Sequence, residues 1–134
     1  MHLLLIHQAF ATPQEAGGTR HFELARRLVD KGHEVTVITS DVNYLSGERV
    51  RTASNVVVIS DINIRRVSTF FPLHTGFLGR LVNFVMFMLR SIMETFHISN
   101  VDVVWGTSPP IFQGLSAYIA SRIRRVPFIF EVRD

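Results

Sequence analysis

The feature that most constrains the fold is a run of four aliphatic residues at positions 3–6, close to the start of the chain. The run shows no alternation between apolar and polar residues, which is typical of a strand that helices cover on both faces. Residues 20–29 then place Phe22, Ala25 and Leu28 on one helical face, with arginine and glutamate mostly elsewhere. The two segments together predict a central parallel strand followed by an amphipathic helix.

A pair of glycines, Gly17 and Gly18, lies where this helix is predicted to begin. Residues without Cβ let a ligand approach the first-turn N–H groups, which have no partner within the helix and carry partial positive charge. This arrangement suits a phosphate group. The alternative is that the glycines only allow a sharp turn, which is the more common role of an isolated Gly-Gly pair. The chain has neither a G-x-G-x-x-G motif nor a Walker lysine.

The rest of the chain repeats the same pattern of strands and helices. Gly32 is predicted to end the first helix, and residues 34–39, which are rich in β-branched side chains, are predicted to form the next strand. Two short runs at 56–59 and 62–67 predict a hairpin whose second arm joins the sheet. The remaining elements are predicted as a helix at 76–97, a strand at 101–105, a helix at 110–124 and a strand at 126–132. We therefore predict an α/β fold, a single Rossmann-like domain over residues 1–134 with a parallel sheet and helices on both faces.

The two later helices differ in how clearly their buried faces can be read. The helix at 76–97 carries apolar residues over more than the usual stripe. Burial on more than one side is the better default, and contact with a membrane interface or a partner is the alternative. For the helix at 110–124 we expect an inner face of Phe112, Leu115, Ile119 and Ile123. Three arginines near its C-terminal end are interpreted as solvated charges favoured by the helix dipole: Arg122, Arg124 and Arg125.

Composition excludes several classes of function. A chain of 134 residues with 47% hydrophobic content can form one domain with a core of its own. The net charge of +3 without a dense basic run argues against nucleic acid as a partner. No cysteine is present and the six histidines show no H-x-x-x-H spacing, so no metal site is predicted. The chain lacks a secretory signal, and charges interrupt the apolar segment 77–96, which predicts a protein that is soluble or peripheral to a membrane.

Candidate binding residues follow from the predicted sheet, because ligands of open α/β sheets bind beyond the carboxyl ends of the strands. The positions that follow the strands are His7, Gln8, Gly17, Gly18, Thr19, Ser40, Asp41, Thr107, Ser108 and residues 131–134. For any one of them a structural role, such as a helix cap or an Asx turn, is the favoured explanation. Their convergence on one edge of the sheet supports a shared site, and no catalytic residue can be assigned.

Three segments of the sequence resemble a known family. The glycine loop at 17–19 leads into ELARRLVDKGHEVTVITS, DVVW at 102–105 is followed by Pro109-Pro110, and residues 128–134 read FIFEVRD. Together they resemble the N-terminal domain of retaining glycosyltransferases of the GT-B type, family four, particularly members that build bacterial surface polysaccharides. The glycine loop joined to the following helix and strand is the more specific signal, because each half alone is weak.

The resemblance implies an activity and a set of site residues. It implies a cytoplasmic transferase that moves a sugar from a nucleotide-sugar donor to a glycan or lipid-linked acceptor, as in lipopolysaccharide synthesis, with no further cofactor and no metal. Gly17, Gly18 and Thr19 would lie near the donor diphosphate. The acceptor-side cleft would include Thr107, Ser108, Arg133 and Asp134. Some relatives have a histidine in the loop after the fourth strand, and residues 106–110 hold none here.

The resemblance also implies that the domain works with a second half. Such enzymes continue into a C-terminal domain that binds the nucleotide and carries an E-x7-E element, so we expect an acceptor-side half, incomplete at its C-terminus and inactive without that missing domain or a partner chain. A docking surface for the inner face of the membrane would comprise Phe70, Phe71, Phe77 and Phe84 with Arg65, Arg66, Arg80 and Arg90. Two alternatives stay open. One is a stand-alone Rossmann-like module that binds a nucleotide or another phosphate ligand, and the other is a non-catalytic interaction domain.

Overall fold

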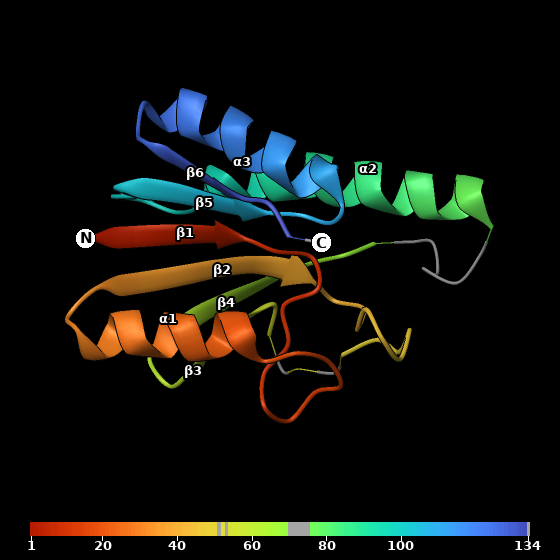
Figure 1. The fold of residues 1–134 in the computed structure, drawn as a ribbon, viewed down its shortest axis with the longest axis horizontal. Coiled ribbons are helices and arrows are strands. Elements are labelled where there is room, and N and C mark those ends of the chain that lie inside the picture. Colours follow the sequence, from red (N-terminus) through yellow and green to blue (C-terminus); the bar gives the residue numbers. More distant parts are fainter. Residues whose placement is uncertain (51, 53, 70–75, 134) are drawn as a thin grey trace.

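A six-stranded sheet with three helices forms the structure, a computed structural model that describes residues 1–50, 52, 54–69 and 76–133 (Figure 1). In chain order the elements are β1 (His2–Ile6), α1 (Arg20–Asp30), β2 (Glu34–Ser40), β3 (Val56–Ile59), β4 (Ile62–Val67), α2 (Phe77–Thr95), β5 (Val103–Thr107), α3 (Ile111–Arg124) and β6 (Phe128–Glu131). Gly32 follows α1 with a φ of 90°, the positive backbone angle that glycine adopts without strain. It therefore closes the helix as predicted.

The strand order is β3-β4-β2-β1-β5-β6, and every pairing is parallel except that of β3 with β4. The strand β1 lies between β2 and β5, as its uninterrupted aliphatic sequence predicts. From β1 the chain builds outward through α1 to β2, and on the other side β5 continues through α3 to β6. The carboxyl ends of the parallel strands therefore meet at one edge, with the topological switch point between β1 and β5. The predicted Rossmann-like α/β fold is confirmed.

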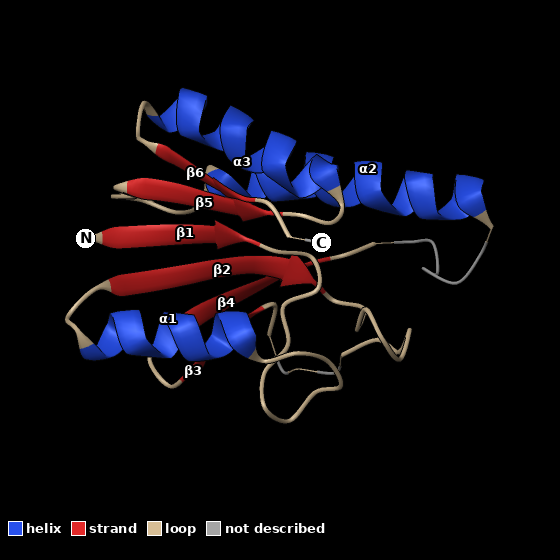
Figure 2. Cartoon of the chain, in the orientation of Figure 1, coloured by secondary structure: helices blue, strands red, loops and turns tan. Residues whose placement is uncertain are grey.

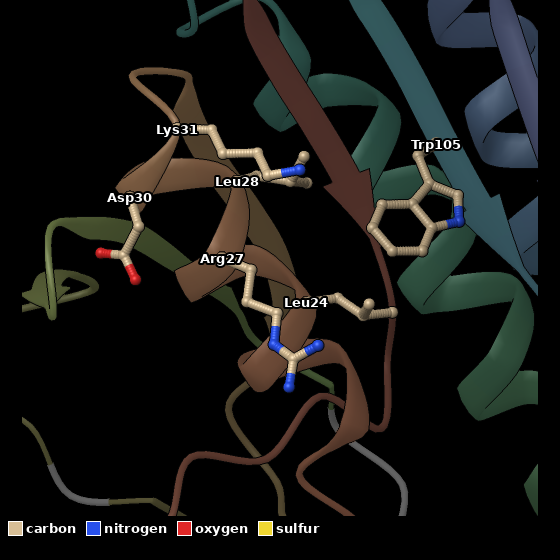
Figure 3. Close-up of a pocket in the computed structure, with 6 residues that line it drawn as sticks. All are labelled: Leu24, Arg27, Leu28, Asp30, Lys31 and Trp105. Carbon is tan, nitrogen blue, oxygen red and sulfur yellow. The ribbon is translucent and has the colours of Figure 1, made fainter.

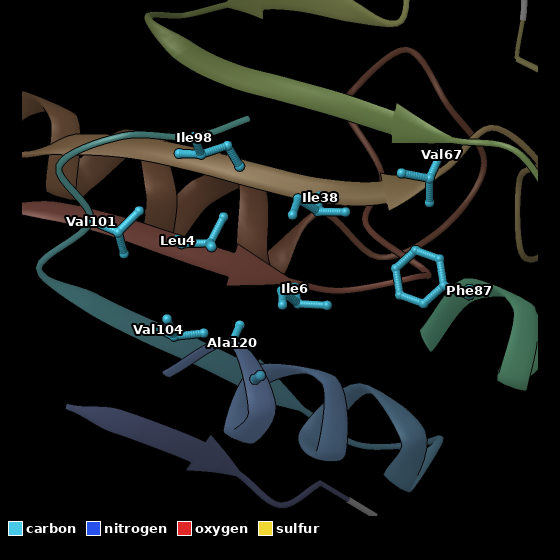
Figure 4. Packing of buried hydrophobic residues seen from close by; sticks show 10 residues of the cluster. Leu4, Ile6, Ile38, Val67, Phe87, Ile98, Val101, Val104 and Ala120 are labelled. Atoms are coloured by element: carbon cyan, nitrogen blue, oxygen red, sulfur yellow. The ribbon is translucent and has the colours of Figure 1, made fainter. Parts of the chain in front are cut away.

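Helices cover both faces of the sheet, with α1 on one face and α2 and α3 on the other (Figure 2). Beneath α1, Leu5 of β1 packs with Phe22 and Ala25. On the opposite face, Leu4 belongs to a second cluster with Phe87 of α2 and Ala120 of α3 (Figure 4). Neighbouring residues of β1 thus enter different cores, which explains why the strand has no polar side.

The strand β5 begins and ends two residues later than the sequence predicts, so Gly106 belongs to the strand rather than to the loop after it. A Cβ at Gly106 would lie 2.6 Å from the Cβ of Ala117. The glycine therefore lets α3 approach the sheet very closely. The strand β6 is shorter than predicted and comprises residues 128–131.

The predicted inner face of α3 is wrong, because the helix packs so closely on the sheet that small residues occupy the contact. Leu115 and Ile123, which we expected inside, are 45% and 42% exposed. The buried residues are mostly small or polar: Gln113, Gly114, Ser116, Ala117, Ala120 and Ser121. The expected solvation of Arg124 is also wrong, because its guanidinium donates hydrogen bonds to the carbonyl oxygens of Thr95 and Ile98.

The expectation that α2 is buried on more than one side is wrong as well. Its fully buried positions are Asn83, Phe87, Ser91 and Thr95, spaced four residues apart on one narrow face. The outer face is apolar, with Leu89 54% and Met93 64% exposed. Among the described residues no helix has both the length and the apolar character needed to cross a membrane. Phe70 and Phe71, expected near this surface, lie outside the described residues.

Candidate functional site

A cavity of about 280 Å³ lies at the carboxyl ends of the central strands. His7, which follows β1, forms part of its wall together with Gly17 and Gly18 of the glycine loop. Arg20 and His21 from the first turn of α1 and Arg133 from the segment after β6 complete its charged and polar lining. Residues separated by more than 100 positions in the sequence thus meet in one place, as the sheet topology requires.

The two glycines play different roles in this wall. Gly17 has a φ of 129°, in the region that favours glycine, and a Cβ there would lie 3.2 Å from Ala11. Gly18 faces open space, because a Cβ there would meet no atom within 4 Å. Thr19 is the N-cap residue of α1 and makes no side-chain cap hydrogen bond, and it does not line the cavity. The structure therefore leaves room for a ligand at Gly18, beside the first turn of α1.

A buried ion pair holds the glycine loop against the sheet. Glu15 in the loop accepts a hydrogen bond of 3.0 Å from Arg66 of β4, which is only 8% exposed. Asn43 donates its side-chain N–H to the carbonyl oxygen of Ala16. Sequence reasoning missed both contacts, since their partners are far apart in the chain. They fix the position of the loop relative to the strand ends.

Gln113 of α3 fixes the orientation of His7. The Nε2 group of Gln113 donates to the carbonyl oxygen of Pro109 at 2.8 Å, so its Oε1 atom faces the end of β1. There Oε1 accepts the backbone N–H of Gln8 at 2.5 Å and contacts Nδ1 of His7 at 3.2 Å. Because Oε1 can only accept, Nδ1 of His7 must carry the proton. Burial lowers the pKa of His7 to about 3, so the ring is neutral at neutral pH.

A second histidine, His21, belongs to an ionic cluster at the end of β6. Its Nε2 atom lies 2.9 Å from Glu131, which also accepts a hydrogen bond from Arg20. Burial lowers the pKa of His21, although the hydrogen bond to Glu131 opposes the shift. Burial alone would raise the pKa of Glu131, but hydrogen bonds from His21 and Arg20 bring it below its usual value. The rings of His21 and His7 lie 4.4 Å apart in an edge-to-face contact.

Thr107 and Ser108, expected to face the cleft, are buried and hold Arg133 instead. Thr107 Oγ1 accepts a hydrogen bond of 3.0 Å from Nε of Arg133, and Ser108 Oγ accepts its backbone N–H at 3.0 Å. Arg133 lines the cavity, while Asp134 lies outside the described residues. The sequence could have indicated His21 by its place directly after Gly-Gly-Thr-Arg, but nothing local indicates that it meets Glu131.

Two other candidate positions have structural roles. Ser40 Oγ accepts the backbone N–H of Val42, and Asp41 pairs with Arg49, outside the residues that line the cavity. Gln8 is buried and donates to Asn83 of α2. Within the described ranges, no group of three or more histidine, aspartate or glutamate side chains could hold a metal ion.

A larger hollow of about 490 Å³ lies between α1 and β5 (Figure 3). Leu24 points from α1 toward Trp105 of β5 there, and Arg27 and Lys31 extend along the rim. Its inner surface is apolar and carries no set of converging polar groups comparable to those around Gly18. The smaller cavity at the strand ends is therefore the candidate site.

One of the comparisons with known proteins shows the family of the chain. Residues 17–132 match the family described as Glycosyltransferase Family 4, and the chain belongs to this family. No curated protein was found to match the sequence. Among solved structures, the chain is similar to the C-terminal domain of a hydrogenase from Pyrococcus furiosus, with 16% identity and a TM-score of 0.58 over 97% of this chain and 89% of that one. At this identity the likeness shows the fold alone.

Proposed function

We propose that this domain is the acceptor-side half of a retaining glycosyltransferase of the kind that builds bacterial surface polysaccharides. Membership of family 4 gives the glycosyltransferase type of function. In the proposal, a sugar passes from a nucleotide-sugar donor to a glycan or lipid-linked acceptor. The observation that carries the proposal is the cavity in which Gly18 faces open space beside Arg20 and Arg133.

The chemistry of the cavity supports binding of the donor diphosphate. First-turn N–H groups of α1 and the helix dipole favour an anion at this position, and Thr19 supplies no competing side-chain acceptor. Arg133 adds a cation whose Nε atom is already fixed by Thr107. Glu131 is paired with the guanidinium of Arg20 and also hydrogen-bonded to His21, so its charge does not oppose a phosphate strongly. The acceptor would enter from the Arg133 side of the same cavity.

A second domain, carried by a longer chain or by another protein, would complete the site. The cavity offers donors for phosphate groups but no unpaired carboxylate among its described lining residues. Large apolar side chains of β6 and the segment after it remain exposed, with Ile129 at 50% and Val132 at 73%. We propose that the other half covers this edge and supplies the nucleotide-binding groups.

Isothermal titration calorimetry with UDP-sugars and GDP-sugars tests whether most contacts to the donor belong to the other half. The proposal predicts weak binding in the millimolar range, because most donor contacts belong to the other half. Micromolar binding by this chain alone would favour the second candidate, a stand-alone module for a nucleotide or phosphate ligand, to which the same cavity gives support. Robust sugar transfer by the purified chain without a partner would contradict the proposed inactivity.

We also propose that the outer face of α2 contacts an anionic membrane surface where the acceptor is lipid-linked. Leu89 and Met93 line an apolar groove of about 540 Å³ along this helix. The acidic residue on the helix, Glu94, is paired with Arg65, so the helix presents apolar side chains with a net positive charge. Such a surface suits the interface of an anionic bilayer.

Liposome flotation tests the membrane contact. The unmodified chain should float with anionic vesicles more than with neutral ones, and Leu89→Ser combined with Met93→Ser should reduce the floated fraction severalfold. Leu45→Ser combined with Val58→Ser is the matched control, because both residues are apolar and exposed on other parts of the surface. Equal flotation of the two double variants would reject the contact.

A further inference from the structure

The ring of His7 is buried but offers one unused hydrogen-bonding atom. Its Nδ1 proton is committed to Oε1 of Gln113, whose orientation is fixed in turn by the donation from Nε2 to Pro109. Within the described part of the chain, Nε2 of His7 has no hydrogen-bond partner. The side chain is 3% exposed and forms part of the cavity wall. A neutral imidazole held in this tautomer presents a lone pair at Nε2, so it can only accept there.

The charged groups of the cavity have the opposite character, whereas Tyr44 and His21, which also line it, can accept as well. Arg20 and Arg133 are donors, and so are the N–H groups of the first turn of α1. A fully ionised phosphate group matches these donors but has no proton to give to Nε2 of His7. A ligand that satisfies both these donors and Nε2 of His7 must therefore carry an anionic group together with a nearby hydroxyl or N–H donor.

Resting on the proposed function, we propose that His7 is a specificity-determining residue whose Nε2 atom accepts a hydrogen bond from a sugar hydroxyl group of the bound ligand. The phosphate lies toward Gly18 and Arg20, and the hydroxyl toward His7. Gln113 is a positioning residue, since it acts only through the imidazole. The sugar hydroxyl contributes to affinity through Nε2, whereas the phosphate binds independently of it.

NMR titrations with two small phosphates test this assignment on the ¹⁵N-labelled chain. Glucose 1-phosphate carries ring hydroxyls, and cyclohexyl phosphate has a similar ring without them. The unmodified chain should bind glucose 1-phosphate more tightly, and His7→Phe should lower that affinity roughly three- to tenfold while leaving cyclohexyl phosphate unchanged. His7→Gln, which keeps an acceptor near the Nε2 position, should recover part of the loss.

The histidine ¹⁵N spectrum of the unmodified chain provides a readout that needs no variant. It should show the proton of His7 on Nδ1, and Nε2 should shift when glucose 1-phosphate is added but not with cyclohexyl phosphate. A proton on Nε2 would overturn the assignment, as would equal affinities for the two phosphates with Gly18 still perturbed, which would leave the phosphate site intact. If neither phosphate perturbs the glycine loop, the proposed function fails, and the role of His7 fails with it.

Discussion

The helices α1 and α2 cover opposite faces of the same sheet, but they differ in which kinds of residue they bury and which they expose. In α1 the buried residues include Phe22 and Ala25, while Glu23 and Arg26 pair on the outside. In α2 the buried row includes the polar residues Asn83, Ser91 and Thr95, and large apolar side chains cover the outside. One helix has its outer face suited to water, and the other does not.

The contrast shows that apolar periodicity alone does not identify the buried face of a helix. Phe87 is the large apolar residue that α2 buries completely, and Asn83 beside it accepts a hydrogen bond from Gln8. A buried polar row is tolerated because such partners are present. The apolar side is then left for another surface, which we propose to be a membrane. Three predictions probe this difference, in order of decreasing effect.

The largest effect is expected from Phe87→Ala. Truncating this fully buried ring removes packing within the core cluster that contains Leu4 and Ile6 and leaves a cavity, so the free energy of unfolding should fall by about 3–5 kcal/mol. Urea denaturation followed by circular dichroism measures the change. Leu89→Ala on the outer face is the matched control and should change stability by less than about 0.5 kcal/mol. Equal losses for the two variants would mean that the faces of α2 are assigned wrongly.

A smaller effect on stability is expected from pH, because His7, His21 and Glu131 lie close together at the strand ends near α1. The pKa of His7 is about 3 in the folded chain and near 6.5 when unfolded, so between these values only the unfolded state takes up the proton. Stability should therefore fall as the pH drops from 6.5 toward 3, by up to about 1.4 kcal/mol per pH unit. The lowered pKa values of His21 and Glu131 act in the same direction.

Denaturation of His7→Phe at pH 7, 6 and 5 isolates this contribution. The variant should lose stability less steeply on acidification than the unmodified chain. Thr95→Val, which removes a neutral polar group beneath α2, should shift stability by the same amount at every pH. An unchanged pH slope in His7→Phe would show that the imidazole is not held neutral by burial.

The smallest effect is expected on the outer face of α1. Glu23 and Arg26 form an ion pair of 3.2 Å with both side chains about half exposed. Glu23→Ala should change the free energy of unfolding by less than about 0.5 kcal/mol, because water screens such pairs. Denaturation at low and high salt measures it. A loss above 1 kcal/mol would indicate that this surface is not simply solvated.

Local sequence patterns were sufficient for the order of strands and helices, because an aliphatic run such as residues 3–6 and the turn at Gly32 depend on nearby residues. The buried faces of α2 and α3 were not predictable in this way. The approach of α3 depends on Gly106 meeting Ala117, and that contact exists only after β5 has joined the sheet. The large apolar residues of α3 are exposed because the helix lies so close to β5, and the spacing of apolar residues along the helix does not predict this.

The candidate site likewise contains some residues that local sequence patterns could place and others that depend on contacts between distant segments. Gly17 and Gly18 could be placed at the cavity from the chemistry of a strand followed by a helix, and Arg133 from the end of its strand. The contact between His21 and Glu131 spans 110 positions, and the buried roles of Thr107 and Ser108 depend on Arg133 folding back over them. Such contacts leave no local signal in the sequence.

The central claim is that the glycine loop and the first turn of α1 hold a phosphate-bearing ligand, and Gly18 provides its most direct test. Because a Cβ at Gly18 meets no atom of the chain, Gly18→Ala should fold normally and place its methyl group where the ligand approaches. In an NMR titration with UDP, the amides of Gly17, Gly18 and His21 should shift in the unmodified chain, and the response should be strongly weakened in the variant. Shifts elsewhere with these amides unmoved, or equal titrations of the two proteins, would contradict the account.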